Sequence, residues 1–278
     1  MGYLNNDGLG YLWQSVKNTL TTKQDSLTGT PGQVVGFDAR GAAAAQDGWS
    51  NQNLLDNWYF TDPIHQRGQT SYTATGYTID RWRIANGALT TDPSSKTLRL
   101  ENIDGDISRN CFFQLLESPW LFAGKTLTFS VLCRDLHGTL TATAYANAGD
   151  TAPFGAPISR DGLASVTFTM ENDIVPTQFR VHWLLSPGGS CVPVAAKLEL
   201  GKAQTLAHQD AAGDWVLNDP PPSRALELTK CRRHYQIFPD AALRPTKAWL
   251  AQPPLRADPA LGSIQIDGKT YYTADADL

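Results

Sequence analysis

Four segments of the chain alternate apolar and polar residues, and this period of two constrains the fold more than any other feature. The segments span residues 126–133, 140–146, 164–170 and 179–183. Their apolar positions are Leu127, Phe129, Val131 and Cys133; Leu140, Ala142, Ala144 and Ala146; Ala164, Val166, Phe168 and Met170; and Phe179, Val181 and Trp183. Successive side chains of a strand point to opposite faces, so each segment predicts a strand with one apolar face. This pattern is typical of an antiparallel sheet with one side on a core and the other in solvent.

Further strands are predicted around these four, with clusters of turn residues between them. They lie at Thr78–Ala85, Thr97–Asn102 and Lys197–Leu200. Short strands at regular spacing are typical of a sandwich or a barrel. The sequence therefore predicts a mainly β fold, with a jelly-roll sandwich of about eight strands over residues 49–205.

The polar faces of the predicted strands carry the candidate ligand-binding residues. If the apolar residues point inward, several planar, hydroxyl and aromatic side chains point outward, among them Arg134, Tyr145, Gln178, Arg180 and His182. Aromatic rings pack on the C–H faces of sugars, while arginine, glutamine and histidine bond to hydroxyl groups. The alternative is an ordinary solvated sheet face, since polar outer faces are the norm.

Residues 1–48 predict a helix and a hairpin that need partners. Apolar side chains recur at helical spacing, at Leu9, Leu12, Trp13, Val16 and Leu20. A helix this short is marginal in water by itself, since isolated helices need about 12–15 residues. It packs either on its own domain or against identical chains. We expect the latter, with Leu9, Leu12, Val16 and Leu20 in a trimer interface.

The predicted hairpin pairs Gln33–Phe37 with Ala42–Ala45 across a tight turn at Asp38–Gly41. An isolated two-stranded hairpin is marginally stable at best. We therefore expect Val35 and Phe37 to join the same trimer interface, so that residues 1–48 form an oligomerisation stem.

Residues 206–278 predict a small C-terminal subdomain. Prolines gather between Pro220 and Pro259, but the tryptophans and tyrosines among them argue against disorder. Ser223–Phe238 predicts one helix. Ile264 and Ile266, an Asp267-Gly268 turn and the tyrosines that follow predict a terminal hairpin.

Composition and motifs argue against several classes of function. The net charge of -4 comes with no basic stripe, so no nucleic-acid partner is expected. The start lacks the charged and apolar regions of a secretory signal, and no apolar run approaches the roughly 20 residues that span a bilayer. The cysteines, at 111, 133, 191 and 231, lack metal-ligand spacing and are expected to be reduced. No nucleophile elbow, phosphate loop or dinucleotide motif occurs, so no enzyme activity, cofactor or metal is expected.

Several blocks of the sequence resemble phage and prophage tail-fibre proteins, as found in prophages of gut Firmicutes. The similar blocks are KQDSLTGTPGQVVGFDARGAAAAQ from Lys23, NQNLLDNWYFTDPIHQRGQTSYTATGYTIDRWRI from Asn51, FAGKTLTFSVLC from Phe122, KLELGKAQTLAH from Lys197 and CRRHYQ from Cys231. The resemblance implies a jelly-roll module like carbohydrate-binding domains in a homotrimeric virion appendage. Such an appendage is assembled with other tail or virion proteins in the bacterial cytoplasm and binds a host-surface glycan. The resemblance identifies no receptor-contacting residue.

These observations leave three hypotheses for the function. The leading one is a tail-fibre receptor-binding protein that adheres to the host through glycans. The second is a purely structural virion component, such as a head fibre, a baseplate part or an adaptor. The third, a polysaccharide depolymerase, is disfavoured because the chain lacks the repeats of a long β-helix.

Overall fold

The structure is a computed structural model whose contacts divide the chain into two compact units, Met1–Trp49 and Ser50–Leu278. Only the backbone is described for residues 34–37, 43–46 and 111. The structure describes residues 10–11, 13–18, 34–37, 43–46, 50–85, 87–92, 94–103, 111–145, 153–171, 178–248 and 251–277.

The first unit contains the predicted helix and hairpin. Residues 10–11 and 13–18 are helical, and Lys17 Nζ lies 5.4 Å from the centre of the Trp13 ring. Strands β1 (Val34–Phe37) and β2 (Ala43–Gln46) pair antiparallel, with Val35 opposite Ala45. The backbone therefore has the two predicted elements within the described residues.

The second unit contains a sandwich of two antiparallel sheets, one of five strands and one of six. The five-stranded sheet has the order β10 (Leu140–Tyr145), β12 (Arg180–Leu185), β8 (Cys111–Leu115), β5 (Trp82–Ala85) and β4 (Gly76–Tyr77). The six-stranded sheet has the order β11 (Gly162–Thr169), β9 (Thr126–His137), β13 (Ser190–Leu200), β7 (Thr97–Glu101), β6 (Ala88–Asp92) and β3 (Ser71–Tyr72).

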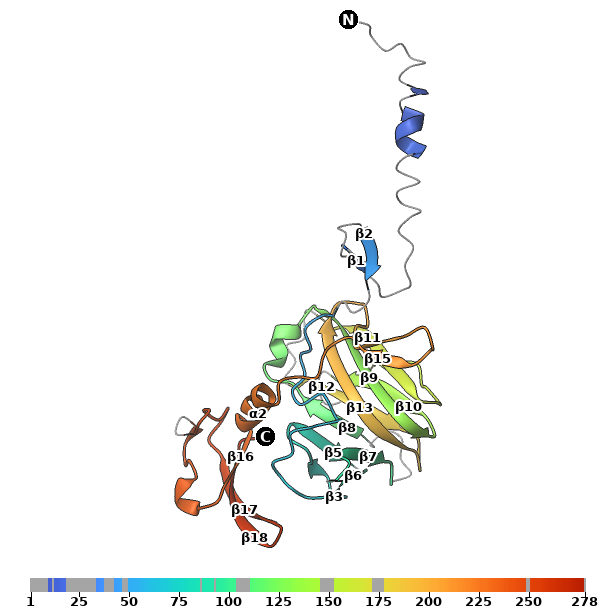
Figure 1. The fold of residues 1–278 in the computed structure, drawn as a ribbon. Coiled ribbons are helices and arrows are strands. Elements are labelled where there is room, and N and C mark those ends of the chain that lie inside the picture. Colours follow the sequence, from blue (N-terminus) through green and yellow to red (C-terminus); the bar gives the residue numbers. More distant parts are fainter. Residues whose placement is uncertain are drawn as a thin grey trace, which may run out of the picture. The chain divides into compact units, whose positions relative to one another are not determined.

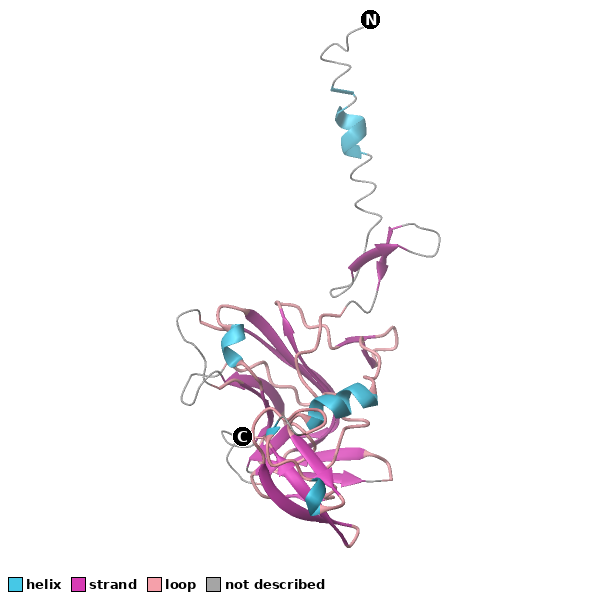
Figure 2. Cartoon of the chain, turned by 90° about the vertical axis from the view of Figure 1, so that its left-hand side faces the viewer, coloured by secondary structure: helices cyan, strands magenta, loops and turns pink. Residues whose placement is uncertain are grey.

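The chain passes from one sheet to the other at almost every connection. From β7 to β13, each strand lies in the sheet opposite to its predecessor. Figure 2 shows that strands rather than helices build the body. This is a jelly-roll β-sandwich, as predicted, with eleven strands in the two sheets instead of about eight. The additional strands include the short β3, β4 and β6, and β8.

The predicted apolar faces form the core between the sheets. Leu127, Phe129 and Val131 of β9 are fully buried, and they face Phe179, Val181 and Trp183 in one continuous cluster. Trp82 stacks on Phe112, with ring centroids 4.8 Å apart. Alternation therefore identified the buried face of each long strand correctly.

The outer face of the six-stranded sheet differs from the prediction, because part of it is covered. Thr128 and Ser130 of β9, which were expected to face solvent, are buried. Lys197 and Glu199 stand beside them on β13 and are also buried. Lys197 donates to Asp219 at 2.8 Å, and Glu199 accepts hydrogen bonds from Thr205. The chain segments that contain Ser50, Thr205 and Asp219 thus lie on this face and replace solvent.

Beyond the sandwich, strands β14 (Ala207–Gln209) and β15 (Trp215–Leu217) form a hairpin, and Trp215 and Leu217 pack against the sandwich core. A short 3-10 helix, η1 (Pro119–Phe122), precedes β9. The predicted boundary at residue 206 stays a prediction.

The C-terminal region contains helix α2 (Arg224–Arg232), β16 (Tyr235–Phe238), η2 (Ala241–Leu243), β17 (Ala260–Ile266) and β18 (Lys269–Asp275). The terminal hairpin is confirmed, with positive φ angles at Asp267 and Gly268. The predicted helix over residues 223–238 is wrong at its end, because residues 235–238 pair with β18 as a strand. Figure 1 shows α2 and this three-stranded sheet at one side of the sandwich.

Buried ion pairs join the C-terminal residues to the sandwich. Arg81 contacts Asp277 at 3.2 Å, and Arg67 contacts Asp275 and Asp277 at 3.2 and 3.0 Å. His234 Nδ1 lies 3.2 Å from Asp277. These contacts hold the last described residues against β4, β5 and the loop before β3.

The thiols of Cys133, Cys191 and Cys231 are buried and free, as expected of reduced cysteines. Among the described residues, no helix has the length and apolarity to span a bilayer.

Candidate functional site

The structure brings three of the five predicted ligand-binding residues together. Tyr145 of β10 stands opposite Arg180 of β12, and His182 lies two residues further along β12. Gln178 is exposed just before β12. Arg134 is exposed on β9, which belongs to the other sheet, so it does not share a face with the rest.

The register of the five-stranded sheet extends this group across every strand. Thr143 stands opposite His182, His182 opposite Phe113, Phe113 opposite Arg83, and Arg83 opposite Tyr77. The sequence neighbours of these residues point into the core, so the residues themselves lie on the outer face. Side chains on directly opposite positions of neighbouring strands touch.

Aromatic and cationic groups are in contact along this line. The rings of His182 and Phe113 are stacked, with centroids 4.9 Å apart, and the rings of Tyr145 and His182 are 4.6 Å apart. The guanidinium of Arg83 lies 5.6 Å from the Phe113 ring and 5.0 Å from the Tyr77 ring. We call the following side chains the aromatic-cation row: Tyr145, Arg180, His182, Phe113, Arg83 and Tyr77.

The row continues past the edge strand β4 into the C-terminal region. The guanidinium of Arg67 lies 5.1 Å from the Tyr77 ring and 3.8 Å from the Tyr235 ring. Burial raises the pKa of Tyr77 and of Tyr235 to about 12 each, so both phenols are neutral at neutral pH.

Exposure differs along the row. His182 is 4% exposed and Phe113 is 5% exposed, whereas Tyr145, Arg180, Arg83 and Tyr77 are half-buried. A ligand therefore has almost no access to the rings of His182 and Phe113. The half-buried residues on either side of them are the ones that a ligand on this face can contact.

His182 is neutral in this environment. Burial, and then the charge of Arg180, hold its pKa well below the ordinary value. Neither ring nitrogen has a hydrogen-bond partner. The positive charge of the row therefore comes from its arginines.

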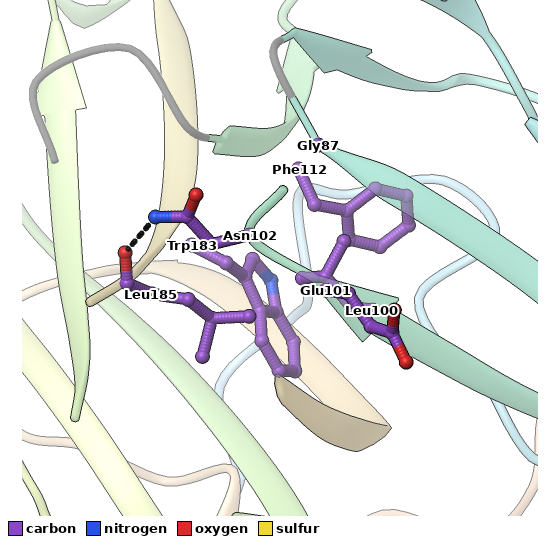
Figure 3. Close-up of a pocket in the computed structure, with 7 residues that line it drawn as sticks. All are labelled: Gly87, Leu100, Glu101, Asn102, Phe112, Trp183 and Leu185. Atoms are coloured by element: carbon purple, nitrogen blue, oxygen red, sulfur yellow. Dashed lines mark hydrogen bonds between the residues drawn. The ribbon is translucent and has the colours of Figure 1, made fainter. Parts of the chain in front are cut away.

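Two cavities elsewhere are weaker candidates. One of about 300 Å³ lies between β6 and the β17–β18 turn, but both of its cationic side chains bond to one carboxylate: Asp62 accepts from Lys96 and from Arg224 at 2.9 Å. The other, shown in Figure 3, has about 10 Å³ beside Trp183, where Asn102 donates to the Leu185 carbonyl at 2.9 Å. That volume is no larger than one water needs.

Sequence reasoning missed Phe113, Arg83 and Tyr77. Phe112 and Phe113 are consecutive, so alternation does not reveal which ring faces outward. Arg83 and Tyr77 join the row only through the pairing of β4, β5 and β8, which no local pattern specifies.

The predicted interface residues lie in the first unit. Val16 is 40% exposed. Leu9, Leu12 and Leu20 lie outside the described residues, as do the side chains of Val35 and Phe37.

Comparison with known proteins gives structural likenesses only. No protein-family model and no curated protein matches the chain. Among solved structures, the chain is similar to CBM4, with a TM-score of 0.34 and 15% identity over 52% of this chain and 99% of that chain. It is also similar to a mutant of the family 29 carbohydrate-binding module CBM29-2, with a TM-score of 0.32 and 12% identity over 47% of this chain and 82% of that one. A third is the enzymatically active domain of tailspike protein 4 of bacteriophage CBA120, with a TM-score of 0.32 and 12% identity over 54% of this chain and 21% of that one. At these TM-scores the likenesses carry no argument about ligands or partners.

Proposed function

We propose that this chain is a non-enzymatic tail-fibre protein that adheres to the bacterial host by binding a surface glycan. The observation that carries the proposal is the aromatic-cation row, which gathers four aromatic or imidazole rings and two arginines on the outer face of one sheet.

The chemistry of the row suits a sugar ligand. The half-buried rings of Tyr145 and Tyr77 add aromatic surface of the kind that packs against the C–H groups of a sugar ring. A guanidinium carries five N–H donors in a fixed plane, so Arg83 and Arg180 can bond to hydroxyl or acidic groups of the same ligand.

We propose that the protein is part of a phage virion. The similarity of the sequence blocks to tail-fibre proteins supports it, and so do the short helix and hairpin of the first unit. Such elements need partners to be stable. We therefore propose a homotrimer that is assembled in the host cytoplasm and joined to other tail or virion proteins.

A panel of bacterial cell-wall and capsular glycans, probed with the full chain, tests the proposal. We expect binding that Arg180→Ala reduces at least tenfold, since a hydrogen bond to a charged group contributes about 1.5–3 kcal/mol. Tyr145→Ala should weaken the same binding, because it removes an aromatic ring from the contact surface. Tyr271→Ala, in the terminal hairpin, is the matched control and should bind normally. Binding that is unchanged in all three variants would exclude the row as the binding surface.

A purely structural virion role is the second candidate, and the burial of Phe113 and His182 favours it. If the row only packs the outer face, Tyr145→Ala will lower the free energy of unfolding and no glycan will bind. Release of reducing ends from host polysaccharide would instead show that the protein is a depolymerase.

A further inference from the structure

Arginines near the row fall into two groups with different partners. Arg67 is paired with Asp275 and Asp277, and Arg81 is paired with Asp56 and Asp277, all at 3.0–3.3 Å. The fold therefore neutralises the buried guanidinium of Arg81 and the largely buried one of Arg67 with two carboxylates each.

Arg83 and Arg180, the two arginines of the row, have no such partners. Neither forms an ion pair or a hydrogen bond within the part of the chain that the structure describes, and their contacts are with the rings of Tyr77, Phe113 and Tyr145. The Nε of Arg83 is buried and has no acceptor. Both side chains are half-buried, so they have lost part of their hydration without gaining a counter-charge.

A cation that has lost part of its hydration and has no counter-charge is well placed to bind an anion, because part of the cost of removing its water is already met. Guanidinium groups match carboxylates and phosphates in geometry, because two parallel N–H groups bond to two oxygens. We propose that the row selects glycans that carry anionic groups, either carboxylates of acidic sugars or phosphodiesters. This inference rests on the proposed glycan binding and specifies the class of glycan.

The spacing of the two arginines indicates that the ligand is a polymer with more than one anionic group. Arg83 stands on β5 and Arg180 on β12, with β8 between them. Neighbouring strands lie about 4.8 Å apart, so the two arginines are separated by roughly 10 Å across the sheet. The guanidinium of Arg180 lies over Tyr145, whereas that of Arg83 lies by Tyr77 and Phe113, so one small anion is not expected to contact both. A polymer with repeated charges can engage both arginines, and their contributions to its binding should then be close to additive.

The test uses the full chain on an array of bacterial polysaccharides. The array includes neutral polymers, uronic-acid polymers, the same uronic-acid polymers after carboxyl reduction, and poly(glycerol phosphate) polymers. Arg83→Gln and Arg180→Gln remove the charges, and Arg180→Lys keeps the charge without the planar fork. Arg160→Gln, at an exposed site just before β11, removes an equal charge elsewhere. Urea unfolding of each variant confirms that it is folded.

We expect acidic polymers to bind and carboxyl reduction to abolish that binding. Each Gln variant should weaken binding about tenfold or more, the double variant about a hundredfold, and Arg180→Lys by an intermediate factor, whereas Arg160→Gln should have no effect. Binding to phosphate polymers alone would identify the anion as a phosphodiester.

Two results would overturn the inference and leave the proposed function standing. One is equal binding of a uronic-acid polymer and its carboxyl-reduced form. The other is an equal loss of binding in Arg160→Gln and Arg180→Gln, which would indicate general charge attraction. Absence of binding to every polymer would overturn the proposed function, and the inference with it.

Discussion

The imidazole of His182 lies flat on the ring of Phe113, with centroids 4.9 Å apart and planes 11° from parallel. The stack buries the imidazole without a hydrogen bond to either nitrogen. A histidine placed in this way is stable only in its neutral form, and this gives the first prediction.

The contribution of His182 and His65 to the free energy of unfolding should fall as the pH drops below about 6.5, the ordinary pKa of histidine. Buried Asp80, whose pKa burial raises to about 7, contributes with the opposite sign. The pKa of folded His182 is held below that value by burial and then by Arg180, and the pKa of His65 is lowered to about 4 by burial and then by Arg67. The unfolded chain therefore takes up protons first. Each group should contribute a slope of up to about 1.4 kcal/mol per pH unit, from about pH 6.5 down to its folded pKa.

Urea unfolding of His182→Phe at several pH values tests this. The variant keeps a stacked ring and should show a shallower slope than the unmodified chain. His137→Phe, at an exposed position of β9, should keep the full slope. Identical slopes in all three proteins would contradict the prediction.

Removing Asp277 should be strongly destabilising. Burial alone would raise the pKa of Asp277, but the hydrogen bond to His234 and the charge of Arg81 hold it below its ordinary value. Asp277→Ala leaves buried Arg81 and largely buried Arg67 with one carboxylate each, so we expect a loss of about 3 kcal/mol in the free energy of unfolding. Asp258→Ala breaks the exposed ion pair with Lys247 and should leave stability unchanged. Similar effects of the two substitutions would argue against the buried network.

Substitution of Asp219 should lower the free energy of unfolding more than substitution of Lys197, its partner in an ion pair. Lys197 is fully buried, whereas the carboxyl side chain of Asp219 is 26% exposed. Asp219→Ala leaves a buried cation without a carboxylate and should cost about 3–5 kcal/mol. Lys197→Met removes the buried charge and leaves Asp219 partly hydrated, so it should cost about 1 kcal/mol. Denaturant unfolding of both variants measures the difference, and equal losses would refute this account.

Gly155 should not tolerate a methyl group. A Cβ added there would lie 2.2 Å from the backbone oxygen of Ser165, and no flexible side chain can move to relieve the clash. Gly155→Ala should therefore lower the free energy of unfolding by about 1–3 kcal/mol. Gly76→Ala places a Cβ with no atom within 4 Å and should have little effect, as thermal unfolding of both variants can show.

The proposed trimer should have an apparent mass of about three times the 30.3 kDa chain. Val16→Asp puts a charge in the middle of the predicted apolar stripe and should shift the protein towards smaller species. Asn18→Asp lies on the opposite side of the helix, by the helical period, and should leave the mass unchanged. Light scattering measures both, and a monomeric unmodified chain would exclude the trimer.

The alternation of apolar and polar residues was sufficient to predict the long strands and their buried faces, but not to predict the short strands. In β9 and β11 the apolar period is unbroken over most of the strand, because one face packs on the core throughout. In β8 the pair Phe112–Phe113 breaks the period, since the outer ring is buried by its neighbours in the row. At Tyr235–Phe238, pairing with β18 overrides the helical pattern read from the sequence.

Only part of the candidate site was predicted, because local alternation shows which residues face outward but not which strands lie side by side. Tyr145, Arg180 and His182 were assigned to the outer face from local alternation alone. Alternation cannot say which sheet a strand joins, so Arg134 was grouped with residues of the opposite sheet. Phe113, Arg83 and Tyr77 enter the row through long-range register, and that depends on the whole fold.

The repeated passage of the chain between the two sheets has a consequence for how the protein reaches this structure. Because consecutive strands from β7 to β13 belong to opposite layers, no contiguous fragment contains one complete layer without strands of the other. Strand β13 ends at Leu200 and pairs with both β7 and β9, so the six-stranded layer cannot close on a ribosome before that residue emerges. Until then, the nascent chain exposes strand edges whose backbone N–H and C=O groups have no partner strand. Folding should accordingly be slow, in the millisecond-to-second range typical of β-proteins dominated by distant pairings.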